Sequence, residues 1–192
     1  MTHSKPSPLR GAIIGAGYFA GIQMQAWREI EGAVITAVCD LDGDKAKAFA
    51  ARHGISAVYS DVGELLEHEE LDFVDIVTRP DSHLVLVERA AERGLAVLCQ
   101  KPLAPTFKEA KAIVSLCEAK AVPFMVNENW RWQKWYREIK ALLEADTIGA
   151  VFHAFVCMRT GDGRGEAPYQ HQPYFKDMER FLIFETLVHF ID

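Results

Sequence analysis

The stretch LRGAIIGAGYFA, residues 9–20, decides the fold. Its first half, Leu9 to Ile14, is short and apolar apart from Arg10, which is typical of a buried β-strand. Its second half has the pattern GxGxxA and opens a helical stretch that continues to about Ile30. A strand, a glycine turn and a helix in this order are the signature of a dinucleotide-binding unit.

The small residues of this turn have separate roles. Gly15 permits the tight turn, Gly17 lets the backbone approach a pyrophosphate, and Ala20 lets the helix pack closely on the strand. The backbone amides at the start of the helix, near Tyr18 and Phe19, would face the phosphates together with the positive end of the helix dipole. We expect all five residues to contact a dinucleotide cofactor. The alternative is a simple strand-to-helix turn.

An acidic residue ends the second apolar stretch. Asp40 follows 33–39 and lies 20 residues after Ala20, where a carboxylate can accept hydrogen bonds from the adenosine ribose. A carboxylate would also repel the 2′-phosphate of NADP, and the next residues are Leu41 and Asp42 rather than a cation. This predicts NAD as the cofactor in preference to NADP. Alternatively, Asp40 only caps the helix that follows.

Apolar and helical stretches alternate as far as Asn127. The expected strands are 9–14, 33–39, 57–59, 73–78, 96–99 and 123–126. The expected helices are 18–30, 44–53, 62–67, 82–93, with Ser82 as N-cap, and 106–119. This alternation predicts an α/β fold, a doubly wound parallel sheet of the Rossmann type. We assign this cofactor-binding domain to 1–127 and the beginning of an α+β second domain to 128–192.

The second domain has a different character. A tryptophan-rich segment, 127–133, precedes an expected helix at 135–145, one long strand at 149–158, a loop at 160–179 and a helix at 181–192. A lone strand exposes unpaired backbone groups and an apolar face. We therefore expect further strands beyond Asp192, and homo-oligomer formation through the second domain.

Ligands of a doubly wound sheet bind at the carboxyl ends of its strands. We expect six residues to line the cofactor site there: Thr78, Arg79, His83, Gln100, Lys101 and Asn127. A lysine beside a cofactor can hold a substrate hydroxyl and stabilise a developing alkoxide; a solvated lysine at a strand end is the alternative for Lys101. His83, taken alone, is better explained as a first-turn helical residue with no chemical role.

Glu185 and His189 are four residues apart on the last expected helix, so they share one face. A histidine beside a carboxylate is a suitable general base at neutral pH. The same spacing suits a metal pair, but no third ligand is marked, and no metal is expected. By itself such a pair is more often structural.

Composition restricts the remaining function classes. The chain has a formal charge of -6 and 25% charged residues, which argues against nucleic acid or an anionic membrane as partner. The four cysteines form no CxxC pair, and Cys39 and Cys99 lie in apolar stretches, as reduced thiols of the cytosol do. The polar N-terminus carries no signal sequence. We expect a cytoplasmic location.

These motifs occur in the order seen in one family. The chain resembles the glucose–fructose oxidoreductase / inositol dehydrogenase (Gfo/Idh/MocA) family from Leu9 to Asp192. The resemblance rests on the glycine turn, Asp40, residues 78–83, Gln100-Lys101-Pro102, and the Glu185–His189 pair with Ile191-Asp192. It implies an NAD-dependent enzyme acting on CH–OH groups of sugars, polyols or their derivatives. His189 would take the hydroxyl proton, Lys101 would orient the oxygen, and Glu185 would bind substrate or orient His189.

The chain departs from the family pattern in three residues and in length. Gln100 stands where glutamate is usual, so Gln100→Glu should be tolerated; Arg79 replaces a common proline and would favour an acidic substrate. Glu185 is one methylene longer than the usual aspartate. The family's second domain is an open sheet, whereas this chain supplies one strand, a loop and a helix. We expect the chain alone to bind NAD but show little or no turnover.

Two alternatives to a dehydrogenase stay open. One is an NAD-binding regulatory protein, which the family also contains. The other is an NAD-assisted glycoside hydrolase, which oxidises and re-reduces its sugar transiently. The presence of both Lys101 and His189 favours an enzyme over a regulator.

Overall fold

The computed structural model describes residues 7–158, 165–179 and 181–192. It divides the chain into two compact units, the first ending at Asn127 and the second beginning at Glu128. The two units differ in kind, and each is described by itself.

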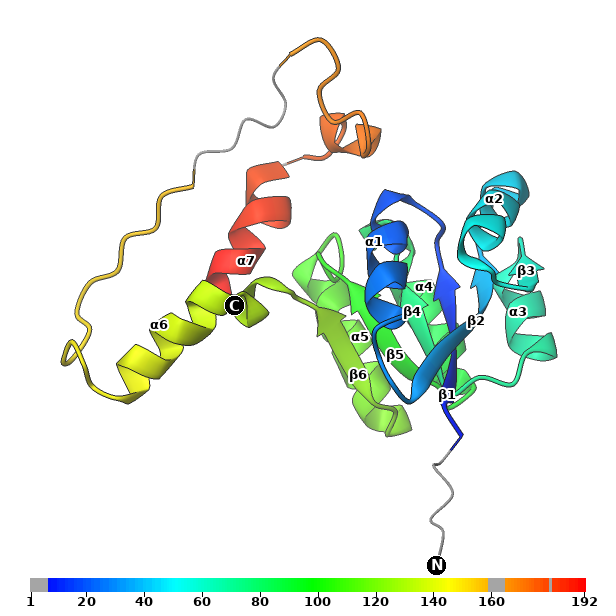
Figure 1. Ribbon diagram of the computed structural model, residues 1–192, viewed down its shortest axis with the longest axis horizontal. Helices are drawn as coiled ribbons and strands as arrows, with labels where there is room; N and C mark the ends of the chain where they lie inside the picture. Colours follow the sequence, from blue (N-terminus) through cyan, green and yellow to red (C-terminus); the bar gives the residue numbers. More distant parts are fainter. Residues whose placement is uncertain (1–6, 159–164, 180) are drawn as a thin grey trace, which may run out of the picture. The chain divides into compact units, whose positions relative to one another are not determined.

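The first unit is a six-stranded parallel sheet with the order β3-β2-β1-β4-β5-β6 (Figure 1). Its strands are β1 Leu9–Ile14, β2 Ala33–Cys39, β3 Ala57–Tyr59, β4 Phe73–Ile76, β5 Ala96–Gln100 and β6 Phe124–Asn127. The helices between them are α1 Tyr18–Trp27, α2 Gly43–His53, α3 Val62–His68, α4 Pro80–Glu92 and α5 Phe107–Lys120. The order reverses between β1 and β4, which confirms the predicted Rossmann fold.

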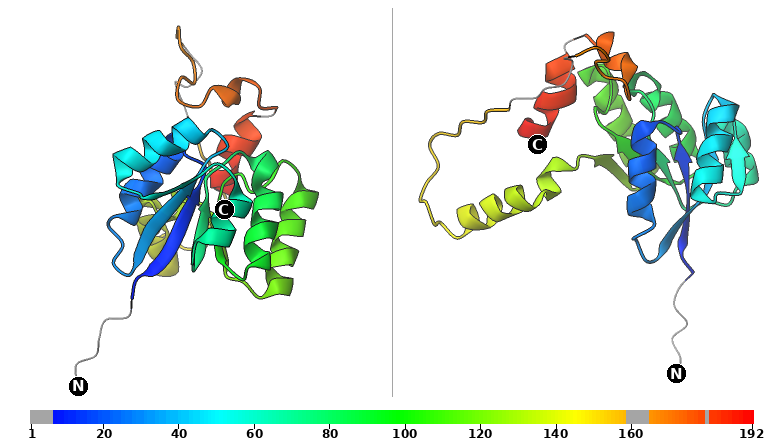
Figure 2. Two further views of the ribbon diagram at one scale, coloured as in Figure 1. Left: turned by 90° about the vertical axis from the view of Figure 1, so that its right-hand side faces the viewer. Right: turned by 45° about the horizontal axis from the view of Figure 1, so that its top comes forward.

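Helices cover both faces of this sheet, as continuous apolar strands require. One core cluster packs α3, α4 and α5 on the sheet, with Leu65, Val87 and Ile113 fully buried. The other packs α1 and α2 on the opposite face through Met24 and Phe49. Figure 2, left, shows the two helix layers with the strands between them.

Helix α4 begins earlier than predicted. Pro80 is its first helical residue and Arg79 its N-cap, because proline suits the position where an N–H is not needed and φ is already helical. The prediction of Ser82 as N-cap is therefore wrong. The Ser82 hydroxyl instead lies 2.7 Å from Thr78 Oγ1 and 2.8 Å from the Arg79 carbonyl.

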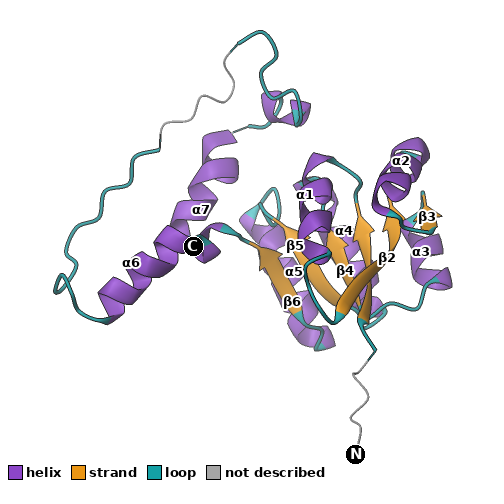
Figure 3. Ribbon diagram, in the orientation of Figure 1, coloured by secondary structure: helices purple, strands orange, loops and turns teal. Residues whose placement is uncertain are grey.

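The second unit contains helices but no strand among its described residues. Its elements are η1 Trp130–Trp132, α6 Lys134–Glu144, η2 Pro173–Lys176, η3 Leu182–Leu187 and α7 Val188–Ile191. Residues 150–158 follow an irregular path (Figure 3), so the predicted strand at 149–158 is wrong. A strand needs a neighbour for its backbone hydrogen bonds, and the described residues of this unit offer none. Of the predicted loop, 160–164 lies outside the described residues.

The predicted final helix is present, but its geometry changes along its length. It is a π-helix over Leu182–Leu187 and an α-helix over Val188–Ile191. Short π-helical turns are frequent at functional sites, and this one carries Glu185 and leads directly into His189.

Within the described ranges, none of the helices is long and apolar enough to cross a membrane. Cys39, Cys99 and Cys117 are buried free thiols. Burial raises the pKa of the Cys39 thiol to about 11, so this cysteine is a packing residue rather than a nucleophile.

Candidate cofactor and catalytic sites

The start of α1 differs from the starts of α2, α3 and α5. Helices α2, α3 and α5 are capped by Asp42, Asp61 and Thr106. Helix α1 begins after Gly17 with no side-chain cap and no acidic residue in its first turn. A Cβ built on Gly17 would meet none of the described atoms within 4 Å. The helix start is therefore uncovered and has room for an anionic group, which fits the pyrophosphate of a dinucleotide.

Gly15 cannot be replaced by a larger residue. Its φ is +101°, and a Cβ there would lie 2.5 Å from the Val77 carbonyl oxygen. The turn thus packs directly on the chain leaving β4. This close approach explains why the first position of the motif must be glycine.

Asp40 is bonded to the glycine turn. Its Oδ2 accepts a hydrogen bond of 2.7 Å from the Ala16 N–H, and its Oδ1 accepts one of 3.0 Å from the Asp42 N–H. The carboxylate is thus fixed beside the pyrophosphate turn, as a ribose-binding residue needs to be. Lys45 on α2 brings its Nζ to 3.5 Å from Asp40 Oδ2. The sequence analysis missed this cation because it considered only the residues directly after Asp40.

The segment after β4 presents one exposed cation and one buried imidazole. Arg79 is exposed and forms an ion pair of 3.6 Å with Asp81. His83 is fully buried; its Nδ1 lies 3.0 Å from the Leu103 carbonyl and its Nε2 3.2 Å from the Thr78 carbonyl. Burial lowers the pKa of His83. These contacts join two loops, so they favour the structural explanation of His83 over cofactor contact.

The ends of β5 and β6 bring the other predicted residues together. Gln100 pairs in register with Asn127, and its Oε1 accepts a 2.8 Å hydrogen bond from the Lys101 N–H. The Asn127 side chain does not face outward: its Nδ2 donates to Asp75 Oδ1 at 3.0 Å. Asp75, in the middle of β4, is a buried carboxylate that the sequence analysis overlooked, although an aspartate within the apolar stretch 73–77 was a visible signal.

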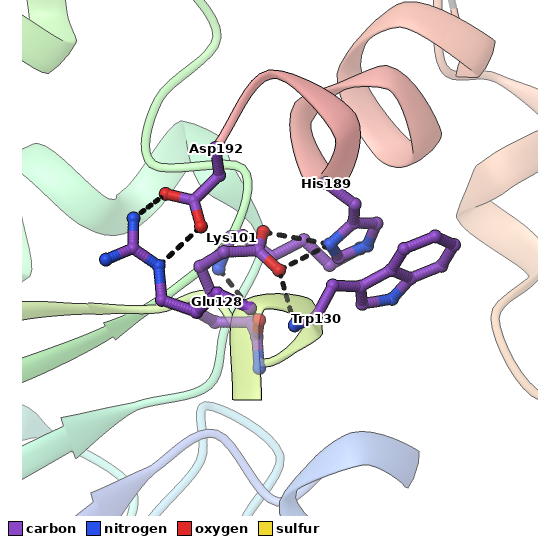
Figure 4. A network of polar contacts seen from close by, with 7 residues as sticks. Lys101, Glu128, Trp130, His189 and Asp192 are labelled. Carbon is purple, nitrogen blue, oxygen red and sulfur yellow. Dashed lines mark hydrogen bonds and ion pairs between the residues drawn. The ribbon is translucent and has the colours of Figure 1, made fainter. Parts of the chain in front are cut away.

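The second unit places a carboxylate against His189, and that carboxylate belongs to Glu128. Its two oxygens lie 2.7 and 2.8 Å from His189 Nδ1 (Figure 4), and both side chains are nearly buried. The backbone N–H of Trp130 donates to the same carboxylate at 2.8 Å. The Trp130 ring stacks on the imidazole, with centroids 4.5 Å apart and planes 7° apart. The imidazole is therefore held in both position and orientation.

This arrangement fixes the tautomer of His189. An ionised carboxylate can only accept hydrogen bonds, so Nδ1 carries the proton and the neutral ring keeps its lone pair on Nε2. An imidazole in this state, with a carboxylate to stabilise the imidazolium, can act as a general base. Glu128 follows β6 in the polar segment 127–129, but no local spacing links it to a residue 61 positions away.

A second pair joins η1 to the residue that follows α7. The Arg131 guanidinium binds the Asp192 carboxylate (Figure 4). The segment 128–131 thus contacts the last four residues twice. Across the described ranges, no three His, Cys, Asp or Glu side chains gather as metal ligands.

Comparison with known proteins identifies the family of this chain. The oxidoreductase family described as having an NAD-binding Rossmann fold matches residues 9–128. This chain belongs to that family, the Gfo/Idh/MocA oxidoreductases, and its first unit is their NAD-binding domain.

Individual relatives extend the similarity beyond this domain. The chain is 40% identical to a D-apiose dehydrogenase of Paraburkholderia graminis, over 95% of this chain and 48% of that protein. It is 41% identical to a D-apiose dehydrogenase of Rhizobium rhizogenes, over 96% of this chain and 52% of that protein. An oxidoreductase from Agrobacterium radiobacter, solved with NAD+, L-tartaric acid and magnesium, superposes with a TM-score of 0.85 at 38% identity. That match covers 95% of this chain and 52% of the other. The chain spans about half the length of the curated relatives it matches.

Proposed function

We propose that this chain carries the cofactor site and the acid–base residues of an NAD-dependent dehydrogenase. The enzyme would move a hydride between nicotinamide and a hydroxyl-bearing carbon of a sugar, polyol or derivative. The observation that carries the proposal is the Glu128–His189 hydrogen bond, because it prepares a base in a chain whose other unit binds NAD. A regulatory NAD-binding protein would have no need of such a base.

Residues of the first unit would bind the cofactor, and Lys101 and His189 would act on the substrate. The start of α1 holds the pyrophosphate, and Asp40 holds the adenosine ribose. NAD, when bound, supplies the hydride acceptor. Lys101 orients the substrate oxygen and stabilises the alkoxide, and His189 takes the hydroxyl proton on Nε2 while Glu128 stabilises the imidazolium. Glu185 would contribute to substrate binding.

NAD is proposed as the preferred cofactor, with a moderate margin. The Asp40 carboxylate would repel a 2′-phosphate placed against it. Lys45, 3.5 Å from that carboxylate, reduces the repulsion. NADP should therefore bind more weakly than NAD without being rejected outright.

The substrate class follows from the relatives and from Arg79. Both D-apiose dehydrogenases are about 40% identical to this chain, which makes D-apiose the first candidate. The Agrobacterium radiobacter structure contains L-tartaric acid, a dicarboxylic hydroxy acid. Arg79 is an exposed cation at the same edge of the sheet, so hydroxy acids and sugar acids are the second candidates.

The test is a substrate panel on the full-length protein with NAD, followed at the NADH absorbance band. We expect reduction of NAD with D-apiose or a sugar acid, and loss of that signal in His189→Ala. Tight NAD binding without turnover of any substrate would favour a regulatory protein. Chemical conversion of a glycoside without net NADH would favour the NAD-assisted hydrolase.

A further inference from the structure

Asp75 is a fully buried carboxylate at the centre of the sheet that none of the proposed roles uses. Its exposed fraction is 0%, as are those of Val74 and Ile76 on either side. Burying a carboxylate is costly unless hydrogen bonds compensate it. Three side chains donate to it: Trp27 Nε1 at 2.8 Å, Gln23 Nε2 at 3.0 Å and Asn127 Nδ2 at 3.0 Å. These hydrogen bonds compensate the cost of burying the carboxylate.

The carboxylate sets the direction of a chain of hydrogen bonds. Because Asp75 only accepts, Gln23 must turn its NH2 group toward it, which leaves Gln23 Oε1 as an acceptor. Gln100 must then donate, and its Nε2 lies 3.2 Å from that oxygen. This leaves Gln100 Oε1 as the acceptor for the Lys101 N–H at 2.8 Å. Each amide orientation follows from the one before it.

We propose that Asp75 is the positioning residue for Lys101, acting through Gln23 and Gln100, and that its charge is the reason residue 100 is glutamine. The inference rests on the proposed function only where it assigns Lys101 a catalytic role. The hydrogen-bond chain from Asp75 to the Lys101 backbone is a property of the first unit alone.

A glutamate at position 100 does not fit beside Asp75. It would have no N–H to give Gln23 Oε1, so two acceptor oxygens would face each other across about 3.2 Å. It would also add a second negative charge to a buried site. We therefore expect Gln100→Glu to be harmful, whereas the family pattern alone predicts that it is tolerated.

An asparagine at position 75 would reverse the order of donors and acceptors in this series of hydrogen bonds. Its oxygen can accept from Trp27, and its NH2 can donate to a turned Gln23 and a turned Asn127. Gln23 then donates to residue 100, and glutamine there is left with its NH2 toward the Lys101 N–H. Glutamate at position 100 satisfies both, because one oxygen accepts from Gln23 and the other from Lys101. The protein should therefore tolerate Asp75→Asn and Gln100→Glu together but neither substitution alone.

The first test is a double-mutant cycle of thermal unfolding on the 192-residue chain, with Asp75→Asn, Gln100→Glu and both. Gln100→Glu should lower the melting temperature by about 5 °C or more when residue 75 is Asp. It should cost little or nothing when residue 75 is Asn. The surface pair Asp44→Asn and Gln25→Glu makes the same two changes on exposed side chains and should show additive effects. Additive effects at 75 and 100 would overturn the inference.

The second test reports on Lys101 itself. Trace acylation followed by peptide mass spectrometry gives the labelling rate of Lys101 relative to Lys120, an exposed lysine on α5. We expect this ratio to change at least about threefold in each single variant and to return in the double variant. A general loss of stability would raise the labelling rates of both lysines. It would therefore not explain a change in the ratio that appears in each single variant and disappears in the double variant. A constant ratio in all variants would show that Asp75 does not position Lys101.

Neither readout uses turnover. Lack of activity in the substrate panel would contradict the proposed function and leave this inference standing. Additivity in the cycle, or an unchanged Lys101, would contradict this inference and leave the dehydrogenase standing.

Discussion

The two units of this chain are stabilised in different ways. The first unit has two apolar core clusters on opposite faces of a complete sheet. Among the second unit's residues whose burial is described, only Glu128 is buried; α6 buries none of its side chains and Phe152 is 99% exposed. Its described contacts include the Glu128–His189 pair, the Arg131–Asp192 pair and clusters of aromatic rings.

Under the proposed function, this difference places cofactor binding and catalysis in units of different stability. The residues proposed to bind NAD belong to the unit with its own core, which can hold them in place without help. The proposed base belongs to the unit held by polar pairs and stacked rings. Helix α6 even exposes apolar side chains, among them Trp135, Ile139 and Leu142. NAD binding should therefore depend on one unit, and turnover on both.

Removing either of the two side chains proposed as catalytic should produce the largest effect and separate turnover from NAD binding. In the full-length protein, Lys101→Ala and His189→Ala should each lower kcat by about a hundred- to ten-thousandfold. NAD affinity should change little, because both residues act on the substrate oxygen. Steady-state kinetics and calorimetric NAD titration measure the two quantities. Lys120→Ala and His153→Ala, both exposed, are the matched controls. Near-native turnover in either catalytic variant would remove that residue from the mechanism.

Glu128→Gln tests whether the Glu128 carboxylate prepares His189 as a base. A glutamine can donate its NH2 to His189 Nδ1 and stabilise the tautomer with its proton on Nε2, which cannot act as a base. We expect kcat to fall about a hundredfold, with NAD affinity unchanged. Glu144→Gln, on exposed α6, is the control. An unchanged kcat would mean that Glu128 only supports the fold.

Cofactor preference sharpens the assignment of the first unit. Asp40→Ala should narrow the NAD-over-NADP preference, by about tenfold if one exposed charge interaction is lost. Lys45→Ala should widen it, because the cation beside Asp40 is removed. Titration of both cofactors against each variant measures the ratio. Tighter binding of NADP than NAD by the unaltered chain would show that Asp40 does not select the cofactor.

The smallest expected effect concerns pH. Burial raises the pKa of Asp75, against the lowering effect of hydrogen bonds from Trp27, Asn127 and Gln23. A carboxyl with a raised folded-state pKa binds its proton more tightly when folded, so its contribution is greatest below its unfolded value and is lost as pH rises through the folded value. The free energy of unfolding of the unaltered chain, minus that of Asp75→Asn, should fall as pH rises above about 4. Urea unfolding at several pH values measures this difference; a flat or rising difference would contradict the raised pKa.

Local signals were sufficient for the first unit. The glycine turn, Asp40 and the alternating apolar stretches each depend on neighbours within a few residues, so the Rossmann fold of this unit followed from the sequence, whereas its strand order came from the structure. The start of α4 was misplaced because Ser82 was preferred to Pro80. Lys45 was missed because it reaches Asp40 from the next helix, five positions away in the chain.

Non-local signals were not readable. The apolar pattern of 149–158 suggests a strand, but a strand exists only with a partner, and a pattern cannot supply one. Glu128 and His189 meet across 61 positions, and the sequence offered the nearer Glu185 instead. Asp75 was visible as an acid within an apolar strand, yet its three donors come from α1 and β6, and only the structure brings them together.

The most direct test of the division between the units is limited proteolysis of the 192-residue chain with and without NAD. We expect early cuts after Asn127 and a resistant fragment that ends near that residue. The purified fragment should bind NAD with an affinity close to that of the intact chain. The fragment should show no turnover with any substrate. Resistance that extends uniformly to Asp192, or a fragment that folds but has lost NAD binding, would contradict this division.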